Sequence, residues 1–289
     1  MLPIYSSMNL LRTKDEISRY RKQLHHEGSS LGLVPTMGAL HEGHLELVRR
    51  ACLENESVLV TIFVNPTQFN NSQDLLKYPK TLESDLSKLK DLDCAISVFA
   101  PEVSEMYGAS PNARIYDFGN LERVMEGVYR PGHFNGVATI VEVLLRLILP
   151  DRVYFGEKDY QQLQIVRQMV GQKEIPVSIV PCPIVREADG LAMSSRNTLL
   201  TNRLRKEAVL LYKTLREVKN SFGTKNANQI AEYVREAFAA HPDFKLEYFS
   251  IADEETLLPL GTIDETKKYR GFIAAYLGGV RLIDNLSLN

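Results

Sequence analysis

The sequence predicts an α/β protein, with a doubly wound parallel sheet in its N-terminal part and a smaller α+β domain after it. Residues 57–64 (SVLVTIFV) form a continuous β-branched and aromatic run, which is typical of a strand buried on both faces of a parallel sheet. Short apolar runs also alternate with amphipathic segments through the first part of the chain. From Thr201 onward, charged helical segments dominate and a few alternating strands follow, which indicates a second domain.

The first elements form a strand–helix–strand unit. Residues 13–26 are predicted to be a helix that ends at the Gly28-Ser29-Ser30 segment. Residues 31–35 are the first predicted strand, residues 45–54 a helix with an apolar stripe, and residues 57–64 the second strand. Such a unit crosses over with a right hand, so its two strands are parallel neighbours in one sheet.

Further alternating elements complete the predicted sheet. In the helix predicted at residues 78–91, Leu82, Leu86 and Leu89 face inward, whereas Glu83 and Asp85 lie on the solvated face. The other predicted elements of this part are a strand at 94–99, an edge strand at 114–118, a loop at 127–136, an apolar helix at 137–149, a strand at 152–155, a helix at 163–170 and a strand at 177–181. Four or five strands alternating with helices predict a doubly wound sheet.

The C-terminal part has a different composition. Helices are predicted at residues 203–222 and 228–241, and an alternating strand at 244–252. Two more strands, at 272–277 and 280–283, flank Gly278-Gly279, which is a two-residue hairpin pattern. We therefore predict two domains, residues 1–184 and residues 185–289.

Composition excludes several classes of protein. The chain has 289 residues, 44% apolar and 24% charged, with a formal net charge of −2, so no nucleic-acid or membrane-surface partner is indicated. The cysteines Cys52, Cys94 and Cys182 form no C-x-x-C pair, so neither a zinc site nor a disulfide framework is expected. With no signal-type N-terminus and no long apolar stretch, we predict a cytoplasmic protein in a reducing compartment.

The stretch PTMGALHEGH, residues 35–44, is the strongest candidate site. It follows the first predicted strand and opens a helix whose first turn carries His41 and His44 on one face. Unpaired N–H groups and a partial positive charge at a helix N-terminus favour anions, so imidazole donors beside them suit a phosphate. Two surface histidines on an ordinary capped helix are the alternative, because H-x-x-H alone is a weak motif.

Three more polar clusters follow predicted strands. Asn65 and Gln68 come directly after the second strand and could bind a substrate, or Asn65-Pro66 could start an ordinary turn. The segment 156–162 (GEKDYQQ) places a lysine where it can neutralise phosphate charge. The segment 193–197 (MSSRN) offers two hydroxyls and a guanidinium for phosphate. Alternatively, this stretch only leads into the next helix, with Thr198 or Thr201 as its N-cap.

Common nucleotide motifs are absent from the sequence. There is no G-x-x-x-x-G-K-[ST], which excludes a P-loop, and no G-x-G-x-x-G, which disfavours a dinucleotide dehydrogenase. The four clusters hold no cysteine and no nucleophile–base pair at an obvious spacing. What these patterns favour is a Rossmann-like nucleotide site that stabilises charge while the α-phosphate of ATP is attacked.

The clusters also carry a family resemblance. HEGH at 41–44 and MSSR at 193–196 resemble the two phosphate-binding motifs of nucleotidyltransferases related to class I aminoacyl-tRNA synthetases. More closely, the chain resembles the pantoate–β-alanine ligase family. The matching segments are PTMGALHEGH, FVNPTQF, YPKTLESDL, RPGHFNGVATIV, FGEKDYQQL, READGLAMSSRN and GGVRLIDN, which span nearly the whole chain.

The resemblance implies a ligase that forms a C–N amide bond in pantothenate and coenzyme A biosynthesis. Pantoate and ATP would give pantoyl adenylate and pyrophosphate, and β-alanine would then give pantothenate and AMP. The family uses Mg²⁺ with ATP and is usually a homodimer through its N-terminal domain. The predicted domains would then be a Rossmann-like nucleotide- and pantoate-binding domain and a C-terminal lid. Two alternatives stay open: a nucleotidyltransferase that releases its adenylylated product, and a non-catalytic nucleotide-binding module.

The resemblance also assigns site residues. His44 would be catalytic, either as a proton donor or only as a hydrogen-bond donor to phosphate. The residues implied to take part in catalysis are His41, His44, Lys158, Ser194, Ser195 and Arg196. Those implied to bind ATP are Met37, Gly38, Ala39, Leu40, His41, Glu42, Gly43, His44, Gly156, Glu157, Lys158, Asp159, Val185, Met193, Ser194, Ser195 and Arg196. Those implied to bind pantoate or β-alanine are Pro35, Thr36, Asn65, Gln68 and Gln162. Magnesium would be held by the ATP phosphates, with Asp85 as a candidate ligand.

Overall fold

A computed structural model describes residues 8–289, which divide into two compact units. The first unit contains residues 8–118 and 130–183, and the second contains residues 119–129 and 184–289. The boundary expected from the sequence lies between residues 184 and 185. That residues 119–129 belong with the second unit was not predicted, because no pattern in that segment indicates its packing partners.

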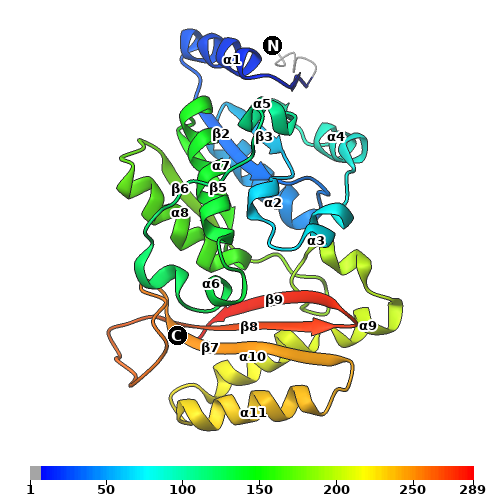
Figure 1. Ribbon diagram of the computed structural model, residues 1–289, viewed down its shortest axis with the longest axis vertical. Coiled ribbons are helices and arrows are strands. Elements are labelled where there is room, and N and C mark those ends of the chain that lie inside the picture. The colour runs from blue at the N-terminus through cyan, green and yellow to red at the C-terminus, as the bar shows by residue number, and fades with distance from the viewer. Residues whose placement is uncertain (1–7) are drawn as a thin grey trace. The chain divides into compact units, whose positions relative to one another are not determined.

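The first unit is built on a six-stranded parallel sheet with the strand order β1-β4-β3-β2-β5-β6. Its strands β2, β3, β5 and β6 are labelled in Figure 1. This sheet confirms the predicted fold class. Its strands are β1 (Leu10–Leu11), β2 (Leu31–Thr36), β3 (Ser57–Ile62), β4 (Ile96–Phe99), β5 (Arg152–Gly156) and β6 (Ser178–Cys182). The two-residue strand β1 was not predicted, since it is too short to show a periodicity. The edge strand predicted at residues 114–118 is wrong, because this segment pairs with no strand of the described chain.

Helices cover both faces of this sheet. They are α1 (Lys14–Glu27), α2 (Glu42–Glu54), α3 (Ser72–Lys77), α4 (Leu82–Lys90), α5 (Val103–Tyr107), α7 (His133–Ile148) and α8 (Tyr160–Gln172). Helices α2 and α4 share one buried apolar cluster with the strands, and α7 packs against both α1 and α8. The loop predicted at residues 127–136 is wrong: it contains the short helix α6 (Glu126–Tyr129) and the start of α7. Gly132 adopts a φ of 78° before His133, so α7 begins four residues earlier than the apolar run suggested.

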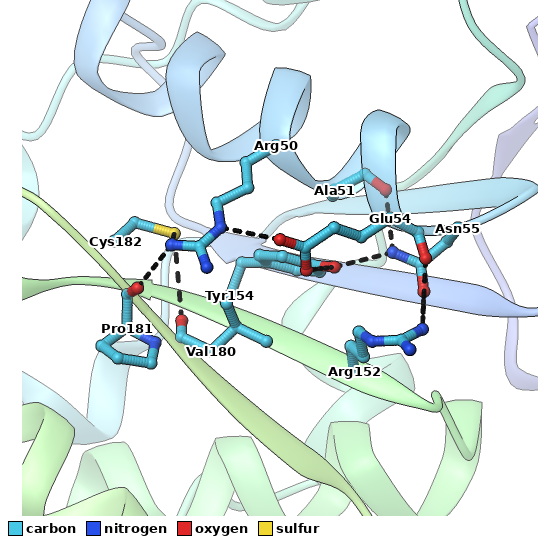
Figure 2. A network of polar contacts seen from close by, with 9 residues as sticks. All are labelled: Arg50, Ala51, Glu54, Asn55, Arg152, Tyr154, Val180, Pro181 and Cys182. Atoms are coloured by element: carbon cyan, nitrogen blue, oxygen red, sulfur yellow. Dashed lines mark hydrogen bonds and ion pairs between the residues drawn. The ribbon is translucent and has the colours of Figure 1, made fainter.

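A polar network anchors the C-terminal end of α2 to the strands β5 and β6 (Figure 2). Arg50 donates to the carbonyl oxygen of Pro181 (2.8 Å), and the Tyr154 hydroxyl donates to Glu54 (2.9 Å). Asn55 Nδ2 donates to that same hydroxyl oxygen (2.8 Å). Because Tyr154 is buried in the sheet, these bonds tie the C-terminal end of α2 to the strands β5 and β6.

The structure joins Cys52 and Cys94 in a disulfide, whose Cα atoms are 6.0 Å apart. The expectation that the cysteines would not pair is therefore wrong for these two. They are 42 residues apart in sequence, and only the packing of α2 and the α4–β4 connection on the same face of the sheet brings them together. Cys182, the last residue of β6, is buried and free.

The second unit is a three-stranded antiparallel sheet in the order β7-β8-β9, with α10 and α11 packed on it (Figure 1). Its elements are α6, α9 (Asn202–Glu207), α10 (Leu210–Ser221), α11 (Ala227–Ala239), β7 (Phe244–Asp253), β8 (Tyr269–Leu277) and β9 (Val280–Ser287). The predicted Gly278-Gly279 hairpin is confirmed, with φ angles of 56° and 82°. The helix predicted at 203–222 is two helices, α9 and α10, that separate at Ala208 and Val209.

Residues 119–129 are held in the second unit by a partly buried ion cluster around the buried Glu126. Arg281 contacts both Glu126 (2.6 Å) and Glu247 (2.5 Å), and the Tyr248 hydroxyl donates to Glu126 (2.9 Å). A carboxylate this deeply buried needs such partners, so the cluster commits α6 to this unit. Across residues 8–289, no helix combines the length and apolarity that a membrane span requires.

Candidate active site

Three of the predicted clusters follow the carboxyl ends of adjacent strands in the first unit. The order of strands reverses between β2 and β5, and ligands of doubly wound sheets bind at such a point. The stretch 37–44 follows β2, the 3₁₀ turn Glu157–Asp159 follows β5, and Asn65 begins the 3₁₀ turn Pro66–Gln68 after β3. The sheet therefore brings together the clusters at 36–44, 65–69 and 156–162.

The loop between β2 and α2 has a strained backbone that α4 holds in place. Gly38 and Ala39 both have positive φ angles, 80° and 51°, and an alanine rarely adopts this region. The Asp85 carboxylate accepts the backbone N–H groups of Ala39 (2.9 Å) and Leu40 (2.8 Å), and Lys88 Nζ donates to the Leu40 carbonyl oxygen (2.5 Å). Asp85 is 0% exposed, so its predicted place on the solvated face of the helix is wrong. Its main-chain partners are 46 and 45 residues away in the sequence, so the helical pattern cannot reveal them.

His41 and His44 lie at the start of α2, as predicted, with ring centroids 4.1 Å apart. The backbone N–H of His41 donates to Nδ1 of His44 (3.4 Å), so this nitrogen is an acceptor and the proton of the neutral ring lies on Nε2. His41 Nδ1 is buried and has no hydrogen-bond partner among residues 8–289. The pair thus offers a hydrogen-bond donor on His44 and an unsatisfied polar atom on His41, at a helix terminus that favours anions.

Both imidazoles are neutral. Burial lowers the pKa of His44 to about 3, helped by the neighbouring His41 and by the positive charges of Lys158 and Lys88. Burial also lowers the pKa of His41 to about 4, again with Lys158 and Lys88 contributing. Two ammonium groups therefore act on the same small region as the histidines. An anion bound there would meet two cations and a neutral donor.

This neutrality predicts a pH-dependent stability. The unfolded histidines have a pKa near 6.5, so between about pH 6.5 and pH 4 the unfolded chain binds protons that the folded chain does not. Stability is therefore lost as the pH falls through this range, by about 2 kcal/mol for each histidine between pH 7 and pH 5. Chemical denaturation at both pH values should show this loss reduced in a His41→Asn/His44→Asn variant. Replacing the exposed His25 should leave it unchanged; an equal loss in all three proteins would contradict the prediction.

Asn65 and Gln68 belong to one hydrogen-bonded group. Asn65 is 1% exposed, and its Nδ2 donates to Gln68 Oε1 (3.0 Å) and to the Gly136 carbonyl oxygen (3.1 Å). Gln68 is half-buried, and its Nε2 contacts Met37 Sδ at 3.1 Å. The Gln68 side chain therefore reaches the loop after β2, whereas Asn65 is enclosed behind it.

Helix α7 packs against this 3₁₀ turn. His133 Nδ1 lies 2.8 Å from the Gln68 carbonyl oxygen, and a Cβ on Gly136 would overlap the carbonyl of Thr67. His133 is buried, so it contacts the turn and is not in an open loop, where it was placed from the sequence. Neither contact is visible in the sequence, because α7 follows the turn by more than 60 residues.

The close approach at Gly136 predicts a sensitive position. Gly136→Ala should push the 3₁₀ turn and Gln68 away from α7, costing about 1–3 kcal/mol of unfolding free energy, the usual cost of overpacking. Gly171→Ala in α8 is the matched control: its Cβ would meet nothing within 4 Å, so it should be neutral or gain up to about 1 kcal/mol. Thermal denaturation of the two variants compares them. A Gly136→Ala protein as stable as the control would show that the turn yields without cost.

The other candidate site residues of the first unit differ in their burial and in their hydrogen-bond partners. Lys158 Nζ lies 4.0 Å from Asp159 Oδ2, and Gln162 is half-buried in the first turn of α8. The Thr36 hydroxyl donates to the Thr61 carbonyl oxygen (2.7 Å) and accepts the Gly38 N–H (3.1 Å), so it shapes the loop. The Glu42 side chain is exposed and pairs with Arg49.

The fourth cluster belongs to the second unit. Val185 and Met193 are paired across a short antiparallel turn, where the Met193 N–H donates to the Val185 carbonyl oxygen (3.0 Å). Arg186 anchors this turn through the buried Asp284 (2.6 Å). Ser194 Oγ accepts the Arg196 N–H (3.2 Å) and begins the 3₁₀ turn Ser195–Leu199. The capping alternative is correct for Thr201, which is the N-cap of α9: its Oγ1 accepts the Leu204 N–H (3.4 Å). Ser195 and Arg196 are half-buried on the 3₁₀ turn.

No group of three or more histidine, cysteine, aspartate or glutamate residues within the described chain could hold a metal ion. The Asp85 carboxylate accepts hydrogen bonds from two backbone N–H groups and from the Thr81 hydroxyl (3.1 Å), so it stabilises the loop and is not placed as a magnesium ligand. Magnesium usually keeps several waters and binds through substrate phosphates, so a protein cage is not required.

Comparison with known proteins identifies the family of this chain. The family model for pantoate-beta-alanine ligase matches residues 9–287. The chain belongs to the pantoate–β-alanine ligase family. It is 48% identical over 282 residues to pantothenate synthetase of Christiangramia forsetii, covering 98% of this chain and 100% of that protein. It is 47% identical to pantothenate synthetase of Flavobacterium psychrophilum, covering 97% and 100% of the two chains.

Solved structures of this family have the same fold. Pantothenate synthetase from Thermus thermophilus superposes with a TM-score of 0.89 at 43% identity, covering 97% of this chain and 99% of that one. The pantoate–β-alanine ligase of Francisella tularensis, complexed with β-γ ATP and β-alanine, has a TM-score of 0.81 at 35% identity, covering 98% of each chain. Family membership confirms the resemblance predicted from the motifs. It makes the chain an enzyme, a ligase that forms an amide bond.

Proposed function

We propose that this chain condenses pantoate with β-alanine at the expense of ATP, through a pantoyl adenylate. The strongest support is the pair of neutral imidazoles at the N-terminus of α2, beside Lys88 and Lys158 at the switch point of the sheet. Such a site binds and stabilises a phosphate without a nucleophile of its own. That is what an adenylation needs, because the carboxylate of the substrate is itself the nucleophile.

In the first step, a pantoate carboxylate oxygen attacks the α-phosphorus of ATP. The bond from this phosphorus to the bridging oxygen breaks, and pyrophosphate leaves with the electron pair. His44 Nε2–H donates to a phosphate oxygen as charge builds there, and Lys158 offsets that charge. Gln68 and Gln162 hold pantoate, since amide groups bind a carboxylate and hydroxyls without removing the carboxylate's charge.

In the second step, the uncharged amine of β-alanine attacks the acyl carbon of the adenylate. The carbon–oxygen bond to the phosphate breaks, AMP leaves, and the amine nitrogen loses a proton as the amide forms. AMP is a good leaving group, so positioning of the amine is the main contribution required of the protein. The backbone of residues 37–44 and 156–159 would bind the nucleotide. Val185 and residues 193–196 of the second unit, with hydroxyls and a guanidinium, suit its phosphates.

Four further properties complete the proposal. ATP would arrive with Mg²⁺ on its phosphates, and no step depends on a protein ligand to that ion. The protein would form a homodimer through its first unit. There the apolar side chain of Ile115 is 94% exposed, while the N–H groups of its neighbours Arg114 and Tyr116 donate to side chains of α7 and hold the segment in place. It would act in the cytoplasm, where ATP is available. The second unit would act as a lid domain over the reaction.

A product assay tests the function. Purified protein with ATP, Mg²⁺, pantoate and β-alanine should form AMP and pantothenate in equal amounts, and omitting either acid substrate should abolish AMP. Release of a free adenylylated or dinucleotide product would favour a nucleotidyltransferase. ATP binding without turnover would favour a non-catalytic binding module. Either of these two results would overturn the proposal.

A further inference from the structure

Tyr107, which no sequence pattern singled out, contacts the substrate-binding turn through Asn65. Its hydroxyl donates to Asn65 Oδ1 at 2.6 Å. The Thr67 hydroxyl (3.0 Å) and the Thr67 N–H (3.4 Å) donate to the same oxygen. Tyr107 ends the short helix α5, so a residue outside the three clusters is bonded into one of them.

Main-chain groups determine which way the Asn65 amide points. The Thr67 N–H can only donate and the Gly136 carbonyl can only accept, and they lie on opposite sides of the amide. Oδ1 must therefore face Thr67 and Tyr107, and Nδ2 must face Gly136 and Gln68. Both Nδ2 hydrogens are used, one on Gly136 and one on Gln68 Oε1.

This arrangement also orients Gln68. Gln68 Oε1 accepts the hydrogen bond from Asn65. The Nε2 group, on the other side of the Gln68 amide, therefore lies toward Met37 in the loop after β2. A flipped Gln68 would place its NH₂ against the NH₂ of Asn65, which leaves two donors facing each other. Because Asn65 is 1% exposed, it acts on a ligand only through Gln68.

We propose that Tyr107 and Asn65 are positioning residues that hold Gln68 with its Nε2 donors toward the substrate. The atom of pantoate that Gln68 Nε2 binds is then a hydrogen-bond acceptor, a hydroxyl or carboxylate oxygen. This inference rests on the proposed function. It adds that Gln68 acts as a hydrogen-bond donor to pantoate, and that Asn65 and Tyr107 set this orientation.

Two variants test the chain of bonds. In Asn65→Asp the side chain can only accept, so Gln68 must flip and present its oxygen to pantoate; the KM for pantoate should rise at least about tenfold, while the KM for ATP stays within about twofold. Tyr107→Phe removes one of the donors to Asn65, and a smaller rise of about threefold to tenfold is expected. A pantoate analogue without hydroxyls should lose less affinity in Asn65→Asp than in the wild type if Gln68 binds a hydroxyl.

Tyr154→Phe is the matched control, since this buried tyrosine hydroxyl also bonds an asparagine, Asn55, outside the site (Figure 2). It should leave both KM values unchanged even where its melting temperature falls. A rise in the KM of pantoate that Tyr154→Phe does not share supports the inference. Equal rises for pantoate and ATP, or no rise in Asn65→Asp, overturn it. If the wild type forms no AMP from pantoate and β-alanine, the proposed function itself has failed.

Discussion

Replacing His44 by alanine is expected to slow pyrophosphate release by about 10²- to 10³-fold while the fold stays intact. This is the usual cost of removing one preorganised donor from a site where charge develops in the transition state. The His44 ring bonds only the His41 N–H among the described hydrogen bonds, so its loss removes little from the structure. Single-turnover release of pyrophosphate from ATP and pantoate measures the effect without the later amide step.

The His44→Gln variant separates a hydrogen-bond donor from a general acid. A glutamine amide can place an N–H near the position of the imidazole Nε2, but it does not transfer a proton at neutral pH. Since the pKa of His44 is about 3, the ring is neutral at pH 7, and His44→Gln should keep at least about ten times the rate of His44→Ala. If both variants are equally slow and the wild-type rate falls with rising pH through a single ionisation, His44 is a proton donor after all.

The position of the histidine pair was predictable because it depends on local sequence. A strand, a glycine turn and a helix start can each be inferred from neighbouring residues, and the spacing of His41 and His44 places both on one face. The parallel sheet was predictable for the same reason: β3 is a continuous β-branched run.

The support of the site was not predictable, because it depends on contacts between distant segments. Asp85 was assigned to solvent by helical periodicity, yet it accepts main-chain N–H groups that any sequence would supply. Tyr107 and Asn65 are 42 residues apart, and an amphipathic pattern does not report a side chain that bonds another buried polar group. The Cys52–Cys94 disulfide and the packing of residues 119–129 were not predicted for the same reason: both depend on contacts between distant segments.

Replacing Asp85 by alanine is expected to lower the free energy of unfolding by about 2–6 kcal/mol, because it leaves the N–H groups of Ala39 and Leu40 without acceptors, at about 1–3 kcal/mol each. Glu83→Ala is the control, since this exposed acid lies on the same turn of α4 and should change stability by less than about 0.5 kcal/mol. Urea denaturation at pH 7 compares the two.

The same substitution should weaken nucleotide binding, because the Asp85 carboxylate holds a backbone that does not favour its own conformation. Gly38 and Ala39 are consecutive residues with positive φ, and without their acceptor the loop can relax toward ordinary angles and carry His41 away from the phosphate. Asp85→Asn keeps one acceptor oxygen but turns an NH₂ group toward the second N–H, so its affinity for a non-hydrolysable ATP analogue should lie between those of the wild type and Asp85→Ala. Calorimetric titration orders the three proteins. An Asp85→Ala protein that is destabilised but binds the analogue with wild-type affinity would mean that the loop keeps its shape without α4, and that its strain is held by β2 and α2 alone.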